Sequence, residues 1–447
     1  MKTLIAIFLA ASCAVYAQDE IEGRRLERDI SLINRLPARY LLSGATVHTV
    51  SGESIPNGQV LVVNGKIAEV GAEVKTKVAE VIDLNGMHLY PGIVSAASML
   101  GLVEIGAVRA TRDYSEVGSY TPDVESWRAV NPDSELIPVA RAGGIAYVLP
   151  VPVGGVVRGQ SGLVQLGGWG IEDMTVQGPV ALHVSWPSMN LRLTPKHRVS
   201  KPDDWKSPED QDKNRKKKIK ELKEFFADAR AYLKAKQAAG NKWNEVPAWE
   251  AMLPYLARKK PVMVHANDIR QIKGAVEWAR EEKLNLIICG ARDAWRVPDL
   301  LATNGVSVVY EHVFEQPARD FDEYDSGFRA PGELVEAGVK VAITIGTGRF
   351  GASIARDHSH AAAFAAAHGM PVNEAIRSLT LYPAQMLGVD DRIGSIEVGK
   401  LATLIAVDRP LLDIRGNVKR MWIQGEKVSL ESRHTKLYEK YRRRPVR

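Results

Sequence analysis

The chain has 447 residues, of which 45% are hydrophobic and 25% are charged, as in ordinary globular proteins. This composition excludes a disordered chain, a collagen-like repeat and a membrane protein with many spans. The formal net charge is +6, and the excess lies at the end of the chain, where residues 433–447 hold seven Lys and Arg against Glu439. We therefore interpret residues 431–447 as a solvated basic tail.

Residues 1–17 have the pattern of a secretory signal, with Lys2 before a short apolar run and small residues ending at Ala17. We expect cleavage near Ala17 and export to the periplasm or out of the cell; a membrane anchor is the alternative interpretation. An exported protein is not expected to have a nucleic-acid partner. Cys13 leaves with the signal, so Cys289 remains alone and cannot form an internal disulfide.

The mature chain divides into segments of different residue pattern, and the first is a charged lead-in segment over residues 18–38. In the β-rich residues 39–90, Asn64-Gly65 predicts a hairpin, because both turn positions need positive φ. Residues 91–393 alternate short apolar strands with helical segments, which predicts a parallel α/β domain long enough for a (β/α)8 barrel. Residues 394–430 return to β structure, and we expect them to complete a small β-sandwich with residues 39–90.

Residues 201–241 interrupt the α/β pattern. Apolar residues at helical spacing predict a long amphipathic helix, and Lys213 to Lys220 make its start basic. Two interpretations are open: a docking surface for an anionic partner, or a solvated helix face, which we favour because charge runs usually only solvate a helix.

Two stretches carry a family resemblance. Residues 381–404, LYPAQMLGVDDRIGSIEVGKLATL, resemble the C-terminal signature of the amidohydrolase superfamily in its imidazolonepropionase-like branch. Residues 42–94, which end in YPGIV, resemble its opening β unit and first barrel strand. The resemblance implies a (β/α)8 TIM-like barrel, a β-sandwich built from both chain ends, and hydrolysis of C–N bonds, commonly in cyclic amides, by a metal-activated water.

The resemblance also implies where metal ligands should stand. Active relatives use a His-x-His pair after the first strand, a Lys or Glu from the fourth, one His each from the fifth and sixth, and an Asp from the eighth. This chain has Ala97 and Met99 at the pair, Gly290 or Cys289 at the sixth-strand position and Gly346 at the eighth. Only the fifth-strand histidine, His265, is clearly retained, and one ligand cannot hold a divalent cation. We therefore expect no cofactor and no ordinary metal-dependent hydrolysis.

Some polar residues remain near the expected site. His265 matches the fifth-strand histidine, and His183 stands near the fourth-strand position. With Cys289 they would form a set of N and S ligands that suits zinc, and Glu311 and His312 follow the seventh strand. The alternative interpretation is that His265 is a hydrogen-bonded relic and Cys289 a small buried hydrophobe.

Three functions follow from these observations. The leading hypothesis is an exported, non-catalytic subunit that binds a small molecule or a partner, as a homo-oligomer or beside an active relative. The first alternative is a working hydrolase with a non-standard zinc site around His183 and His265. The second is a sugar- or peptide-binding barrel with Trp169 and Trp186 at its mouth. Residues 154–162 lack the Gly-Lys-Ser/Thr ending of a P-loop, so we interpret their glycines as a loop at that mouth.

Overall fold

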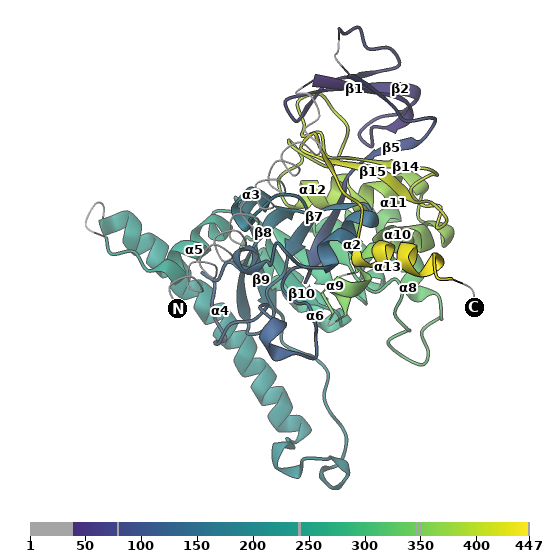
Figure 1. The fold of residues 1–447 in the computed structure, drawn as a ribbon. Coiled ribbons are helices and arrows are strands. Elements are labelled where there is room, and N and C mark those ends of the chain that lie inside the picture. Colours follow the sequence, from purple (N-terminus) through teal and green to yellow (C-terminus); the bar gives the residue numbers. More distant parts are fainter. Residues whose placement is uncertain (1–38, 78–79, 240–242, 346, 349, 446–447) are drawn as a thin grey trace, which may run out of the picture.

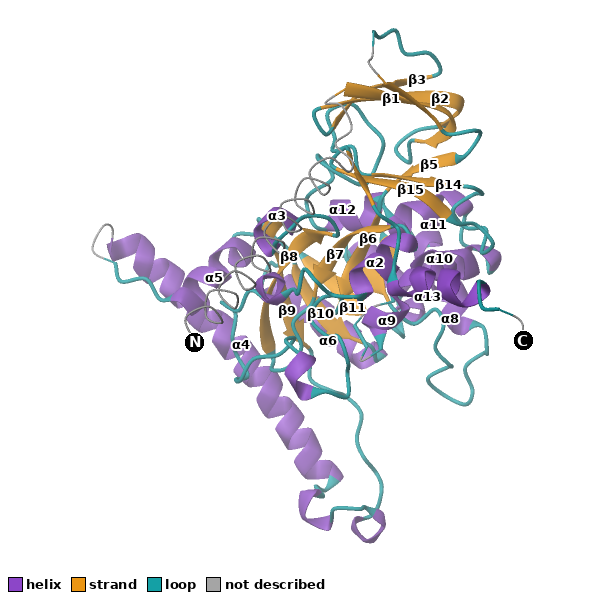
Figure 2. Cartoon of the chain, viewed as in Figure 1, coloured by secondary structure: helices purple, strands orange, loops and turns teal. Residues whose placement is uncertain are grey.

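Two sheets of eight strands organise the residues that the computed structural model describes, which are 39–77, 80–239, 243–345, 347–348 and 350–445 (Figure 1). One sheet forms a small β domain and the other a barrel surrounded by helices (Figure 2). The predicted fold class, a TIM-like barrel with a β-sandwich made from both chain ends, is confirmed. The predicted signal and lead-in segment, together with Gly346, lie outside the described residues.

The β domain joins the two ends of the chain in the strand order β16-β15-β14-β5-β1-β2-β3, with β4 paired to β1. Strand β5 pairs in parallel with β1 and antiparallel with β14. Between β2 and β3, Asn64 and Gly65 have φ of 48° and 76°, which confirms the predicted hairpin. The strands are β1 (Arg39–His48), β2 (Ser54–Val63), β3 (Lys66–Gly71), β4 (Glu80–Asp83), β5 (His88–Pro91), β14 (Leu404–Val407), β15 (Val418–Ile423) and β16 (Glu426–Val428).

The barrel sheet runs in chain order from β6 to β13. Strands β7, β11 and β13 are buried along their whole length, as strands covered on both faces are. The strands are β6 (Ile93–Ser98), β7 (Ile145–Pro150), β8 (Val157–Gln165), β9 (Thr175–Ser185), β10 (Val262–Ala266), β11 (Leu286–Gly290), β12 (Ser307–Tyr310) and β13 (Val341–Ile343). Side chains link the first strand to the last. Thr344 Oγ1 donates to Ala97 O at 2.9 Å and lies 3.2 Å from Ser95 Oγ.

Strand β8 departs from strict β/α alternation, because it runs antiparallel to both β7 and β9. The prediction of a loop over residues 154–162 is wrong from Val157 onward, where the chain is a strand. Its glycines serve packing: a Cβ at Gly162 would lie 2.6 Å from the Trp127 ring. The neighbouring Ser126 bridges β7 and β8 by donating to Pro150 O at 2.6 Å and to Gln160 O at 3.0 Å. Gly162 is therefore required by the close approach of Trp127, although in the sequence it looked like a loop glycine.

Helices cover the barrel, and the longest, α4, confirms the predicted long helix. The predicted basic tail is helical over Arg433–Arg442. Among the described residues no helix combines the length and the apolar character that crossing a bilayer requires. The helices are α2 (Leu136–Ala142), α3 (Ile171–Met174), α4 (Pro208–Ala239), α5 (Pro247–Leu256), α6 (Ile269–Glu281), α7 (Pro298–Thr303), α8 (Ser326–Glu336), α9 (Gly351–Ile354), α10 (His358–Ala367), α11 (Val372–Leu379), α12 (Leu381–Met386) and α13 (Arg433–Arg442).

Candidate functional site

The carboxyl ends of the parallel barrel strands gather a cluster of polar side chains. On adjacent strands His265 pairs in register with Ser185 on one side and Cys289 on the other, so their side chains start at one level. Arg158 reaches the same end from the start of β8, because that strand runs the opposite way. Ligand sites of α/β barrels lie at this end. We call it the barrel mouth.

His183 and His265 form the centre of the cluster. Nδ1 of His183 lies 3.0 Å from Nε2 of His265, and Nε2 of His183 lies 2.7 Å from Ser161 Oγ. Burial, followed by the charge of Arg158, lowers the pKa of His183 to about 3. Burial, Arg158 and His183 together lower the pKa of His265 well below its ordinary value. Both rings are therefore neutral at physiological pH.

Arg158 brings a permanent positive charge into this cluster. Its Nε donates to Ser185 Oγ at 2.5 Å, and this is its one side-chain hydrogen bond within the described residues. Burial lowers the pKa of Arg158, while the nearby Cys289 and Glu311 raise it. A guanidinium still remains protonated in a protein at neutral pH.

Cys289, on β11, and Glu311, directly after β12, lie next to each other. Cys289 Sγ donates to Glu311 Oε1 at 3.5 Å, and Thr347 Oγ1 donates to Glu311 Oε2. Burial, followed by the charge of Glu311, raises the pKa of the Cys289 thiol well above its ordinary value. Burial also raises the pKa of Glu311. The sulfur is therefore a thiol in the metal-free protein, and a thiol is a poor nucleophile.

His312 belongs to a neighbouring network and does not join Glu311. Its Nε2 donates to Asn267 Oδ1 at 2.6 Å, and its Nδ1 lies 2.7 Å from Glu315 Oε2. The hydrogen bond from His312 lowers the pKa of Glu315 to about 2. Beside this network lies a polar cavity of about 400 Å³, lined by Asn190, Asn267, Asp268, Ile269, Arg270, Gln271, Arg292, Asp293, Ala318 and Arg319.

The positions where the family resemblance requires ligands are occupied by packing residues. Ala97 and Met99 are buried in the apolar core, and the Ala97 carbonyl accepts the bond that links β6 to β13. Gly290 has a φ of +90°, and a Cβ there would lie 2.5 Å from Asn267 Oδ1. A histidine at residue 290 would be strained and would displace Asn267, so the loss of this ligand is built into the fold.

The side chains at the mouth do not fit a divalent metal. Both nitrogens of His183 are engaged, Cys289 Sγ is hydrogen-bonded to Glu311, and Arg158 places a positive charge beside them. Within the described residues no group of three or more His, Cys, Asp or Glu side chains is arranged to hold a metal ion. A zinc site needs about four convergent ligands with free lone pairs, and this cluster does not supply them.

The order Ser161, His183, His265 has the connectivity of a nucleophile, a base and an orienting group. Ser161 is fully buried, however, and a histidine with a pKa near 3 is a weak base at neutral pH. The arrangement therefore serves to satisfy buried polar groups and holds β8, β9 and β10 together.

The two tryptophans do not form an aromatic-lined mouth. Trp186 is buried, and its ring centroid lies 5.7 Å from that of Trp278, a residue of α6. Trp169 is exposed in the loop after β8, which is at the opposite end of the barrel because β8 is antiparallel.

Arg158 is the residue whose role sequence reasoning missed. The loop predicted over residues 154–162 was placed at the mouth, where Arg158 does lie, but Arg158 stands on the strand β8 and was not among the candidate site residues. The signal that was present is a single charged residue within residues 154–162.

Comparisons with known proteins agree with this fold. The model of the "Amidohydrolase family" matches residues 172–428. An amidohydrolase from Thermotoga maritima superimposes with a TM-score of 0.75 and 27% identity over 87% of this chain and 99% of that chain. A prolidase bound to N-methylphosphonate-L-proline superimposes over 88% of this chain and 99% of that chain, with a TM-score of 0.53 and 16% identity, which supports the fold alone.

Curated relatives match over short stretches. An N-acetylgalactosamine-6-phosphate deacetylase of Escherichia coli O157:H7 is 43% identical over 61 residues, and an N-acetylglucosamine-6-phosphate deacetylase of Haemophilus influenzae is 51% identical over 49 residues. These stretches are 14% and 11% of this chain and 15% and 13% of the relatives, and the chain covers at most 34% of any of the three relatives matched. The imidazolonepropionase-like branch stays a prediction. On the match over residues 172–428, which is more than half of its length, the chain belongs to the amidohydrolase family.

Proposed function

We propose that the chain is a non-catalytic member of its family, which binds a small molecule at the barrel mouth and lacks metal-dependent hydrolysis. The observation that carries this proposal is Arg158, whose guanidinium lies among the side chains that a metal would need. Its charge opposes a divalent cation, while its remaining N–H groups suit an acceptor oxygen of a ligand, such as a carboxylate. Two further observations support the same conclusion: both ring nitrogens of His183 are hydrogen-bonded, and a side chain at residue 290 would be strained by the positive φ of Gly290.

We also propose that the mature protein begins near residue 18, acts outside the cytoplasm, and associates with a second copy or with an active relative. The support is the signal pattern of residues 1–17 and a barrel that keeps its scaffold while lacking ligands. Sequencing the N-terminus of the protein isolated from its own cells tests export, with Gln18 expected first. Light scattering of the purified protein tests self-association.

A metal and activity measurement tests the main proposal. The purified mature chain is analysed for bound metal and assayed on cyclic amides, dipeptides and N-acetylated hexosamine phosphates, the last because the matched relatives are named for them. We expect metal well below one ion per chain and no turnover. Stoichiometric zinc and hydrolysis, both lost in His265→Ala and kept in His360→Ala, would refute it.

The same experiment decides the second candidate, a hydrolase with a non-standard zinc site. The contact between His183 and His265 and the adjacent Cys289 favour this candidate. It requires Arg158 to move away from these side chains when metal binds. Zinc bound by the wild type would support it, whereas a metal-free and inactive wild type would exclude it.

A further inference from the structure

The segment before α4 and the first turns of this helix project from the barrel as an arm (Figures 1 and 2). We define the basic arm as residues 190–220. It follows the carboxyl end of β9 and therefore leaves the molecule at the barrel mouth. Along α4 the first residue that packs against the core is Ile219, eleven residues after the helix begins, so roughly 16 Å of helix at 1.5 Å per residue extends beyond the barrel.

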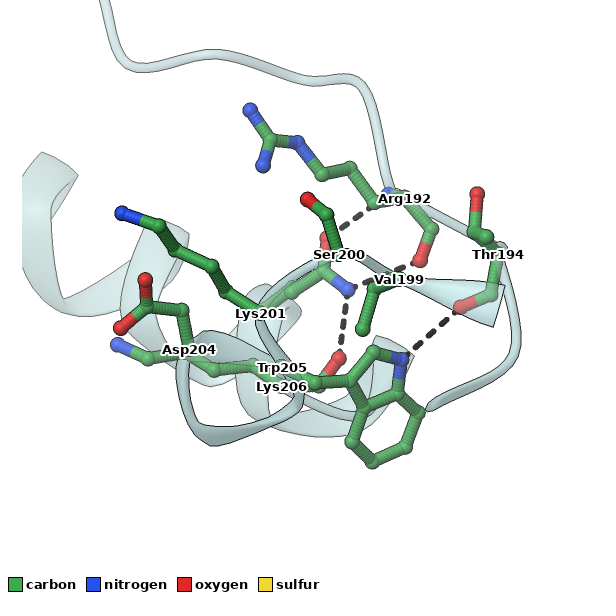
Figure 3. A pocket seen from close by; sticks show the side chains of 9 residues that line it. Arg192, Thr194, Val199, Ser200, Lys201, Asp204, Trp205 and Lys206 are labelled. Carbon is green, nitrogen blue, oxygen red and sulfur yellow. Dashed lines mark hydrogen bonds between the residues drawn. The ribbon is translucent and has the colours of Figure 1, made fainter. Parts of the chain in front are cut away.

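The arm is a built structure, because side chains of the helix hold the preceding segment in place (Figure 3). Gln211 accepts from Arg192 N at 2.8 Å and donates to Arg192 O at 3.0 Å and to Lys206 O at 2.9 Å. Trp205 Nε1 donates to Thr194 O at 2.9 Å. An open cavity of about 530 Å³ lies between the segment and the helix. These hydrogen bonds hold the backbone of the segment against the start of the helix.

The arm carries a concentrated positive charge. Its 31 residues contain eleven Lys and Arg against five Asp and Glu, an excess of six that equals the formal charge of the whole chain. Lys216, Lys217 and Lys220 expose 75%, 73% and 76% of their side chains. Their acidic neighbours lie one turn away on the same helix, and such exposed pairs contribute at most about 1 kcal/mol each.

The charge of the molecule is separated in space. Residues 433–447 hold another excess of six, so the rest of the chain carries a net charge of −6. Figure 1 shows α13, which contains half of that second excess, apart from the arm. An anionic surface therefore attracts both the arm and the tail and repels the rest of the chain, so charge limits the choice of contact to these two segments.

Apolar side chains lie among these cations. Leu193 is 73% exposed between Arg192 and Lys196, and Leu191 is 36% exposed. Trp205 is partly exposed beside them. Cations with exposed leucine and tryptophan are the combination that binds membrane surfaces, where Lys and Arg contact lipid phosphates and apolar side chains enter the headgroup layer. An acidic protein surface would need the cations but not the exposed leucines.

We propose that the basic arm docks on the surface of an anionic phospholipid bilayer, with its lysines and arginines on lipid phosphates and Leu193 between the headgroups. Docking in this way turns the barrel mouth toward the bilayer. The proposal does not depend on whether the mouth binds a metal, so either can fail alone.

Vesicle sedimentation of the full mature chain tests this proposal. We expect binding to vesicles that contain phosphatidylglycerol, weak binding to phosphatidylcholine alone, and a decrease with salt. Since each cation near such a surface contributes about 1 kcal/mol, the triple variant Lys216→Glu, Lys217→Glu, Lys220→Glu should bind at least about 100-fold more weakly. Leu193→Ser, which leaves charge unchanged, should weaken binding roughly 10-fold.

A variant of the tail provides the matched control. Arg442→Glu, Arg443→Glu, Arg444→Glu changes the net charge by the same amount and should keep binding. Equal loss in both triple variants would overturn the proposal, because net charge alone would then explain binding. Absence of vesicle binding, with salt-dependent self-association that the arm variant loses, would also overturn it and assign the arm to a second copy of the chain.

Discussion

Gly290 offers the sharpest test of the idea that the missing ligands are built into the fold. Gly290→Ala adds a Cβ at a φ of +90°, and a left-handed backbone costs a residue with a Cβ roughly 1–2 kcal/mol. The same Cβ would lie 2.5 Å from Asn267 Oδ1, the atom that accepts from His312 Nε2. Displacing Asn267 leaves a buried polar group without its partner, which costs about 1–3 kcal/mol more. We expect a total loss of roughly 2–5 kcal/mol.

Urea unfolding followed by tryptophan fluorescence measures this loss. Gly305→Ala is the matched control, because Gly305 has a φ of +62° and no atom within 4 Å of an added Cβ. It should lose only the 1–2 kcal/mol of the backbone. Gly290→Ala combined with Asn267→Ala should lose less than the sum of the two single changes, because the collision is gone. Equal losses for Gly290→Ala and Gly305→Ala would refute the reasoning.

Two further predictions concern buried titratable groups. Burial lowers the pKa of His358 to about 4 and that of His183 to about 3, from 6.5. Below pH 6.5 these histidines are protonated in the unfolded chain but stay neutral in the folded chain. As the pH falls from 6.5 to 4, each histidine therefore lowers the free energy of unfolding by about 1.4 kcal/mol per pH unit. Unfolding free energies against pH should show this slope, and His358→Leu should reduce it; an unchanged slope would contradict the assignment. The Cys289 thiol, buried and with a raised pKa, should react with a thiol reagent at pH 8 only when urea unfolds the chain. Rapid labelling of the folded protein would contradict this.

Much of the scaffold could be predicted from local signals in the sequence. Asn64-Gly65 identifies its hairpin because only certain residues adopt two successive positive φ values. The run from Val262 to His265 identifies a buried strand and places His265 at its carboxyl end, as the structure shows. Such signals depend only on residues that are neighbours along the chain, so they can be read from the sequence.

The features that were missed depend on partners far away in sequence. A Cβ at Gly162 would collide with Trp127, and a Cβ at Gly290 would collide with Asn267. Because both glycines are required by distant residues, their presence in the sequence does not show whether they lie in a loop or in a strand. Strand β8 runs antiparallel to β7 and β9, which brings Arg158 at its start to the mouth. The amphipathic pattern predicted α4, whereas its projection beyond the barrel depends on where its packed apolar face begins, at Ile219.

The account depends most on the charge of Arg158 at the barrel mouth, and a zinc titration measures its effect directly. Isothermal calorimetry on the wild type, Arg158→Ala and the control Arg141→Ala, another partly buried arginine, separates this charge from any loss of arginine. We predict no saturable zinc site in the wild type or in Arg141→Ala. In Arg158→Ala we predict weak zinc binding, because without the charge of Arg158 the side chains of His183, His265 and Cys289 can exchange their present hydrogen bonds for the metal. One tightly bound zinc per wild-type chain, with an affinity that Arg158→Ala leaves unchanged, would contradict the account.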